Sequence, residues 1–230
     1  RNHIRVDVAF VPVSRPDEQG YCGLGISNYA WRTIFENART VVFEINEHLP
    51  TLQGVDGSHR VHLSEADYIV EGEHEPLPTR SYKEPSPVDI QIAQHVVAEI
   101  PDGAVLSLGV GGVPFTVAQM LAQSDLRDLG IHTEMLCDCY LDMYRAGKIT
   151  NKRKDIDRYK SVFGFAIGSE DLYDWVRENP GVVTYPISYC NAPSTVRNIE
   201  NFVSINNCIS VDLYGQICAE SAGTRQISGT

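Results

Sequence analysis

The chain has 230 residues, of which 43% are hydrophobic and 21% are charged, as is usual for a soluble globular protein that buries a sizeable core. Asp and Glu outnumber Lys and Arg by 30 to 19, and no stripe of basic residues could neutralise the phosphates of a nucleic acid. No apolar run approaches the roughly 20 residues that span a bilayer. We therefore expect neither a nucleic-acid partner nor a membrane partner.

The pattern of the first 74 residues is that of a β–α–β unit. Alternating, β-rich residues predict a strand over 5–14, and a loop rich in Gly and Pro follows it. The next segments predict a helix over 28–38 and a buried strand over 40–46. This order indicates a parallel sheet covered by helices.

A Pro-rich segment at 75–87 predicts an exposed linker between two partial domains, 1–74 and 88–230. Helices and strands alternate again after the linker. The predicted helices cover 88–100, 113–123, 139–147 and 169–179, and the predicted strands cover 104–110, 130–136, 161–168, 182–188 and 202–216. The sequence thus predicts an α/β protein with open, mostly parallel sheets and flanking helices. Because the chain begins without Met and stops after a cluster of small residues, we also expect an internal piece of a longer polypeptide.

Six cysteines are scattered along the chain, and two of them form the sequence Cys137–Asp138–Cys139. One intervening residue is too few for a zinc knuckle, and no second Cys pair follows. The seven histidines are dispersed and suggest neither a metal site nor a Ser–His–Asp triad. We expect reduced thiols in a cytoplasmic protein and no metal site.

Three glycines mark the junction of a predicted strand and helix in "LSLGVGGVPFTV" (106–117). Glycines allow a ligand to approach the backbone, and a helix start offers free N–H groups and the positive end of the helix dipole. Open α/β sheets bind ligands outside the carboxyl ends of their strands. The spacing is not G-x-G-x-x-G, and the missing Gly-Lys-Ser/Thr excludes a P-loop. The turn is either a ligand contact or simply a tight strand–helix connection.

Glu134 lies in the apolar run "GIHTEML" (130–136). At the carboxyl end of a strand it would face the same crevice as the Gly-rich turn, and partial desolvation would make the ionised carboxylate a stronger nucleophile. The alternative is an ordinary glutamate in the first turn of the next helix, which the residue pattern alone favours. A later segment, 203–223, alternates apolar and polar residues, and there Asn206, Asn207 and Asp212 could form the polar face of a buried strand.

Three stretches, "LGIHTEM", "LSLGVGGVP" and "SINNCISVDLYGQICAESAGTRQISG", together resemble the acetyl-CoA hydrolase/CoA-transferase family, close to its branch of 4-hydroxybutyrate and butyryl-CoA:acetate CoA-transferases. "VSRPDEQGYCGLGIS" and "VVFEINEHLP" are similar to the first domain of that branch. The resemblance runs from residue 5 to residue 230 in family order. It implies CoA-transferase-like domains, and that the family chain extends beyond both ends of this one.

The resemblance also implies roles for individual residues. Glu134 matches the covalent nucleophile of the family. The coenzyme A site maps onto the Gly-rich turn and one residue of the later strand motif, namely Gly109, Val110, Gly111, Gly112, Val113 and Ile209. Coenzyme A and acyl-CoA would be substrates, with no tightly bound cofactor, and a homo-oligomer is expected.

The implied reaction moves CoA from a short-chain acyl-CoA to a carboxylic acid such as acetate, by a ping-pong scheme through a glutamyl-CoA thioester. Three alternatives remain open from the sequence. The same glutamate would serve an acyl-CoA hydrolase that uses water as acceptor. A non-catalytic α/β module that binds CoA or assists assembly is a second alternative. A sugar-phosphate isomerase of similar sheet architecture is a third, resting on fold analogy alone.

Overall fold

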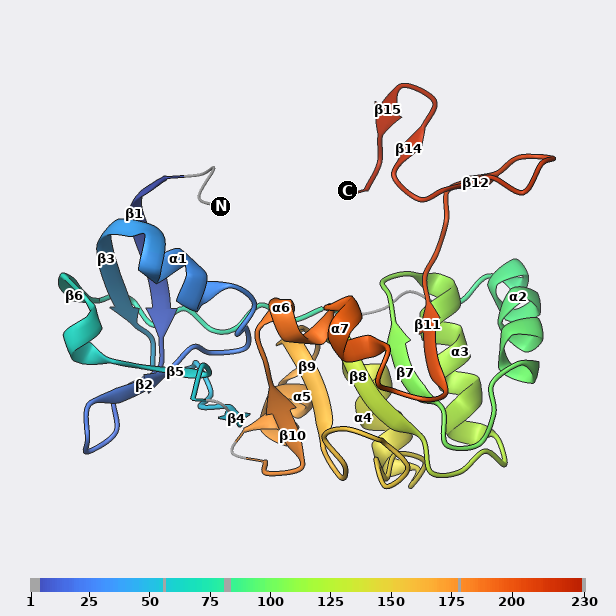
Figure 1. Ribbon diagram of the computed structural model, residues 1–230, viewed down its shortest axis with the longest axis horizontal. Coiled ribbons are helices and arrows are strands. Elements are labelled where there is room, and N and C mark those ends of the chain that lie inside the picture. The colour runs from blue at the N-terminus through green and yellow to red at the C-terminus, as the bar shows by residue number, and fades with distance from the viewer. Residues whose placement is uncertain (1–4, 56, 81–83, 178, 229–230) are drawn as a thin grey trace.

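The computed structural model describes residues 5–55, 57–80, 84–177 and 179–228, and it has the predicted α/β architecture (Figure 1). The helices are α1 (Trp31–Asn37), α2 (Pro87–Ala98), α3 (Gly112–Gln123), α4 (Asp138–Arg145), α5 (Glu170–Val176), α6 (Ile187–Cys190), α7 (Pro193–Val196) and the 3-10 helix η1 (Leu63–Glu65). The strands are β1 (Val6–Val13), β2 (Tyr21–Gly23), β3 (Ala38–Ile45), β4 (Gln53–Gly54), β5 (Arg60–His62), β6 (Tyr68–Glu71), β7 (Val105–Leu108), β8 (Gly130–Leu136), β9 (Ser161–Ala166), β10 (Val182–Thr184), β11 (Phe202–Ile205), β12 (Ser210–Val211), β13 (Ile217–Cys218), β14 (Ser221–Ala222) and β15 (Arg225–Gln226).

Two parallel sheets form the body of the molecule. The smaller sheet has the strand order β1-β3-β6, and the larger has the order β11-β7-β8-β9-β10-β4. In the larger sheet the order places β7 and β8, which carry the two segments singled out from the sequence, side by side in the interior. Parallel strands that are joined by helices bring the carboxyl ends of neighbouring strands to the same edge of the sheet.

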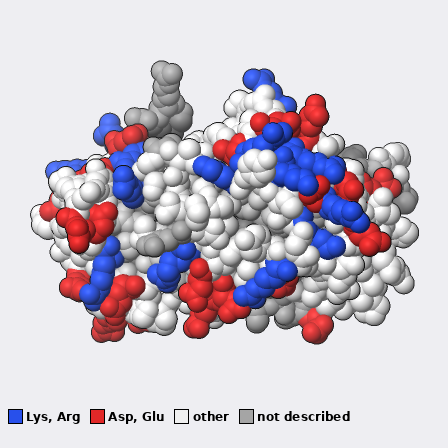
Figure 2. All heavy atoms as spheres, turned by 90° about the horizontal axis from the view of Figure 1, so that it is seen from below, with Lys and Arg blue, Asp and Glu red and all other residues white. Residues whose placement is uncertain are grey.

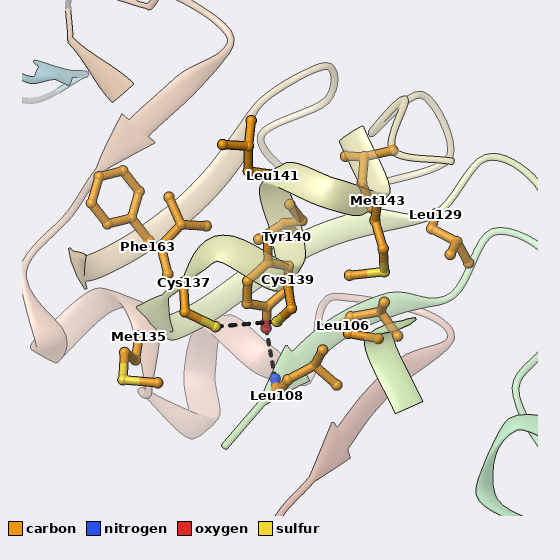
Figure 3. Packing of buried hydrophobic residues seen from close by; sticks show 14 of the residues in the cluster. Leu106, Leu108, Leu129, Met135, Cys137, Cys139, Tyr140, Leu141, Met143 and Phe163 are labelled. Carbon is orange, nitrogen blue, oxygen red and sulfur yellow. Dashed lines mark hydrogen bonds between the residues drawn. The ribbon is translucent and has the colours of Figure 1, made fainter. Parts of the chain in front are cut away.

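The larger sheet is covered on both faces, as parallel sheets generally are. Adjacent residues of β9 demonstrate the two layers, because their side chains point to opposite faces. Phe163 belongs to the main core cluster with residues of α3, α4 and α5, whereas Val162 packs with Cys190 and Ile187 of α6. The main cluster is centred on buried side chains of β7, β8 and α4 (Figure 3).

The predicted linker lies partly against the larger sheet. Thr79 forms an isolated parallel β-bridge with Gly168, and the N–H of Arg80 donates to the carbonyl of Gly168 at 3.1 Å. In the part of the chain that is described, no helix or strand covers residues 72–86. Residues 81–83 of the linker lie outside the described residues. The division into domains at 74 and 88 stays a prediction, and the short strand β4 of the first segment pairs with β10 of the larger sheet.

The predicted strand over 202–216 is wrong beyond Ile205. After pairing with β7 the chain leaves the sheet and forms an arm of two short hairpins, β12–β13 and β14–β15 (Figure 1). The Asp212 carboxylate accepts the N–H groups of Tyr214 and Gln216, which closes a turn where a continuous strand was expected. The predicted strand over 182–188 likewise ends at Thr184, because Pro186 cannot donate a ladder hydrogen bond and precedes α6.

Positive and negative side chains are interspersed on the surface. Lys and Arg gather over part of the face shown in Figure 2, with acidic side chains among them. Asp128, for example, pairs with both Lys152 and Arg153. Within the described ranges no helix is long and apolar enough to cross a membrane.

Candidate active site

Glu134 lies on strand β8 and is partly buried, between the buried residues Thr133 and Met135. Helix α4 begins only at Asp138, so the interpretation of Glu134 as a helix-start residue is wrong. The strand predicted over 130–136 is confirmed. The carboxylate therefore projects from the sheet near the carboxyl end of an interior strand.

Glu134 and the Gly-rich turn open onto one cavity of about 370 Å³. It is lined by Ser107, Leu108, Gly109, Val110, His132, Thr133, Glu134, Met135, Phe165, Cys190, Asn191, Val196, Phe202, Ser204 and Asn206. Of the residues singled out for coenzyme A, Gly109 and Val110 line the cavity. Gly111, Gly112 and Val113 continue from them into the start of α3, and Ile209 lies on the arm, 37% exposed.

The Gly-rich turn is shaped by its close approach to β11. A side chain at Gly109 would place Cβ 2.2 Å from Oδ1 of Asn206. The backbone N–H of Gly109 donates to the carbonyl of Ile205 at 2.8 Å. Gly111 has φ of 138°, in the region that favours glycine, and it is the N-cap of α3 without a side-chain cap. The helix start beside the cavity thus keeps backbone N–H groups available to an anionic or carbonyl ligand.

Both oxygens of the Glu134 carboxylate accept hydrogen bonds from residues far away in the sequence. The amide Nδ2 of Asn191 donates to Oε2 at 2.5 Å, and the hydroxyl of Tyr29 donates to Oε1 at 3.3 Å. Desolvation, followed by the charge and hydrogen bond of Glu134, raises the pKa of Tyr29, so the phenol stays a donor at neutral pH. These two contacts orient the carboxylate in the cavity.

His132 lies two residues before Glu134, on the same face of β8. Its Nε2 is 2.9 Å from the carbonyl oxygen of Cys190, which can only accept, so Nε2 carries the proton. Burial, followed by the charge of Lys154, lowers the pKa of His132 to about 4. The ring is therefore neutral at pH 7 and anchors the residue that precedes Asn191.

Models of the acetyl-CoA hydrolase/transferase family match both ends of the chain. The N-terminal domain model matches residues 1–79, and the C-terminal domain model matches residues 168–230. The chain belongs to the acetyl-CoA hydrolase/transferase family. The sequence resemblance is thereby confirmed.

Similar proteins of this family are named as CoA-transferases. The chain is 48% identical to the probable butyrate:acetyl-CoA coenzyme A-transferase of Syntrophomonas wolfei, over 99% of this chain and 51% of that protein. It is 41% identical to the 4-hydroxybutyrate coenzyme A transferase of Clostridium kluyveri, over 97% of this chain and 51% of that protein. The chain thus spans about half the length of the curated relatives it matches.

Solved structures show the same fold. RipA from Yersinia pestis superposes with a TM-score of 0.86 at 37% identity, covering 93% of this chain and 48% of that one. The 4-hydroxybutyrate CoA-transferase from Porphyromonas gingivalis superposes with a TM-score of 0.83 at 38% identity, covering 92% of this chain and 52% of that one. The predicted CoA-transferase-like fold is confirmed by these similarities.

Sequence reasoning missed Tyr29 and Asn191. Neither residue lies in a stretch with a recognised chemical pattern, and 105 and 57 positions respectively separate them from Glu134. Asn206 had been noted as a hydrogen-bonding residue and lines the cavity, whereas Asn207 contacts the carbonyl of Val110 at 3.5 Å. Among the described residues, no group of three or more His, Cys, Asp and Glu side chains is suited to hold a metal ion.

Proposed function

We propose that the protein transfers CoA between a short-chain acyl-CoA and a carboxylic acid such as acetate, with Glu134 as the covalent nucleophile. The observation that carries the proposal is the single cavity shared by Glu134 and the Gly109–Val110 turn, in a chain of the acetyl-CoA hydrolase/transferase family. The turn and the start of α3 offer backbone donors for coenzyme A. Butyrate, 4-hydroxybutyrate and acetate are the acids suggested by the names of the relatives.

The first half-reaction begins when an oxygen of ionised Glu134 attacks the thioester carbonyl of the acyl-CoA. The carbon–sulfur bond breaks, which leaves an acyl-glutamyl anhydride and the CoA thiolate. The thiolate then attacks the glutamyl carbonyl, and the carbon–oxygen bond of the anhydride breaks. The acid leaves as its carboxylate, and Glu134 is left as a glutamyl-CoA thioester.

The second half-reaction reverses these steps with another acid. Its carboxylate attacks the glutamyl thioester, which gives a new anhydride and releases the thiolate. The thiolate attacks the acyl carbonyl of this anhydride, frees Glu134 and leaves as the new acyl-CoA. No net proton transfer is required, because carboxylates serve as nucleophile, substrate and product.

Hydrogen-bond donors near Glu134 support this chemistry. Each attack on the glutamyl carbonyl places negative charge on an oxygen of the Glu134 side chain. Asn191 and Tyr29 already donate to these oxygens, and one such donor is typically worth about 3 kcal/mol in a transition state. The partial burial of Glu134 helps to keep water from the anhydride.

An acyl-CoA hydrolase is the second candidate, because an acetyl-CoA hydrolase of Neurospora crassa is also similar, at 24% identity. The two candidates differ in the acceptor. With the full-length protein and butyryl-CoA, we expect acetyl-CoA to form when acetate is added, and little thioester to be lost in buffer alone. Thioester loss that does not depend on acetate would favour the hydrolase.

Glu134→Gln tests the nucleophile in the same assay. Transfer should fall by more than a thousandfold, on the order of the loss of a covalent nucleophile in other enzymes. Glu170→Gln, which changes a carboxylate at the start of α5 outside the cavity, is the matched control and should retain activity. Retained transfer in Glu134→Gln would contradict the role of Glu134 as the nucleophile. Binding of CoA without any transfer by the wild type would instead favour a CoA-binding module.

Two further proposals concern the cellular compartment and the oligomeric state of the protein. The six cysteines are free thiols in the structure, which supports a reducing compartment such as the cytoplasm. A homo-oligomer stays a prediction, to be tested by light scattering on the full-length protein.

A further inference from the structure

The two strands that carry the candidate active site separate just before they reach the cavity. The pairing of β7 with β8 ends at Leu106 and Ile131. Beyond that point β7 continues to pair with β11 as far as Leu108, and β8 continues to pair with β9 as far as Leu136. A gap therefore opens between two strands that are each held on their outer side.

The hydroxyl of Tyr140 lies in this gap. Tyr140 projects from α4, is fully buried, and accepts the N–H of Leu108 at 2.7 Å (Figure 3). The N–H of Gly109, the next residue, donates to Ile205 of β11. Since successive N–H groups of a strand point in opposite directions, the N–H of Leu108 faces β8. The phenol oxygen thus takes the place that a carbonyl of β8 would occupy in a continuous ladder.

The same hydroxyl lies close enough to β8 for the side chain of Thr133 to lower the pKa of the phenol through hydrogen bonding, against the larger effect of burial. Leu108 immediately precedes Gly109 of the turn, and Thr133 immediately precedes Glu134. Tyr140 therefore connects the residue before the Gly-rich turn to the residue before the glutamate. Desolvation by burial, with smaller effects of Cys137 and Cys139, raises the pKa of the phenol, so the hydroxyl keeps its proton.

We propose that Tyr140 is a positioning residue that sets the distance between the Gly109 turn and Glu134. The proposal rests on the proposed function, because it assigns the cavity between these two elements to the transfer reaction. Without the hydroxyl, the N–H of Leu108 would be buried without a partner, and β7 could regain one only by moving towards β8. Such a movement narrows the cavity, and a displacement of about 1 Å between reacting groups can cost about a hundredfold in rate.

Tyr140→Phe tests the proposal against a matched variant, Tyr173→Phe. Tyr173 is also buried, and its hydroxyl accepts the N–H of Gly168 and donates to the carbonyl of Pro78, but it does not line the cavity. In the full-length protein we expect Tyr140→Phe to lower kcat for CoA transfer by roughly ten- to a hundredfold. The Kd for free CoA should change by less than threefold, whereas Tyr173→Phe should leave both constants near the wild-type values. An unchanged kcat in Tyr140→Phe, or an equal loss in both variants, would overturn the proposal.

Amide hydrogen exchange gives a second test, which the wild-type protein alone can fail. The N–H of Leu108 should be strongly protected in the wild-type protein, and in Tyr140→Phe its exchange should become at least tenfold faster. Rapid exchange of this amide in the wild type would overturn the proposal even if Tyr140→Phe does not fold. Failure of the proposed function is distinguishable, because it would appear as a lack of transfer by the wild type with Leu108 still protected.

Discussion

The side-chain amide of Asn191 donates a hydrogen bond of 2.5 Å to Oε2 of Glu134. Asn191 follows α6 directly, and the carbonyl of the preceding residue, Cys190, accepts from the ring of His132 on the strand that carries Glu134. Two adjacent contacts thus hold the end of α6 against β8. The relationship gives the carboxylate one fixed orientation in the cavity.

Removal of the Asn191 amide should therefore slow the chemistry. We expect Asn191→Ala to lower kcat for CoA transfer by about a hundredfold, the usual effect of losing one donor to a developing oxyanion. Asn198→Ala is a suitable control, since the side-chain amide of Asn198 donates locally, to the carbonyl of Ser194. Steady-state kinetics with butyryl-CoA and acetate would give kcat for both variants. Equal kcat values for Asn191→Ala and Asn198→Ala would show that the contact has no role in the reaction.

Tyr29 should make a smaller contribution. Its bond to Glu134 is longer, at 3.3 Å, and the side chain is 39% exposed, so we expect Tyr29→Phe to lower kcat by less than tenfold. Since the negative charge of Glu134 helps to raise the pKa of Tyr29, Glu134→Gln should lower that pKa. Titration of labelled tyrosine by NMR measures the shift, and an upward shift would show that Glu134 is not a charged neighbour.

The fold and part of the site could be predicted from the sequence because their signals are local. Hydrophobic periodicity and glycines at strand–helix junctions lie within single segments, so the order of strands and helices along 84–184 was predicted with boundaries displaced by a few residues. The short helices α6 and α7 were not predicted. The segment after Ile205 has the same alternation, but its short strands pair only within their own hairpins and do not join the larger sheet. Pairing depends on what lies beside a strand, which a local pattern does not contain.

The partners of Glu134 could not be predicted for a related reason. Tyr29 comes from the segment before α1 and Asn191 from the end of α6. Their packing against β8 and β9, with a hydrogen bond of 2.8 Å from the N–H of Ile187 to the carbonyl of Tyr29, brings them together. The N–H of Asn28 donates to the carbonyl of Gly164 on β9, which holds the Tyr29 segment in place. The residue pattern around Glu134 favoured a helix start, and only the family resemblance pointed to a nucleophile.

His132 should make the free energy of unfolding depend on pH in the acidic range. Its pKa is about 4 in the folded protein and about 6.5 when unfolded, so between these values the unfolded chain binds more protons than the native one. The stabilisation from keeping His132 neutral is complete above pH 6.5. As the pH falls towards 4 it is lost, and the free energy of unfolding decreases by up to about 1.4 kcal/mol per pH unit. His132→Gln, which keeps a donor for Cys190, should flatten the pH dependence of the free energy of unfolding in urea. An unchanged slope between pH 6.5 and 4 would mean that His132 is not buried in its neutral form.

Gly109→Ala should affect substrate binding more than folding. The added methyl group would lie 2.2 Å from Oδ1 of Asn206, at the end of a side chain that can rotate away from the cavity. We expect a severalfold higher KM for acyl-CoA, with the free energy of unfolding lowered by about 1 kcal/mol. Gly181→Ala is the control, because the atom nearest to its added methyl group would be Oδ1 of Asn179, at 3.4 Å. An unchanged KM in Gly109→Ala would indicate that the turn is only a tight strand–helix connection.

The most direct test of the central claim is the mass of the peptide that contains Glu134 after reaction. The full-length protein would be incubated with butyryl-CoA, treated with borohydride or left untreated, then digested and analysed by tandem mass spectrometry. We predict a CoA adduct on Glu134 in the untreated sample, and reduction of this side chain to the alcohol after borohydride treatment. An active protein whose Glu134 stays unmodified in both samples would contradict the covalent mechanism.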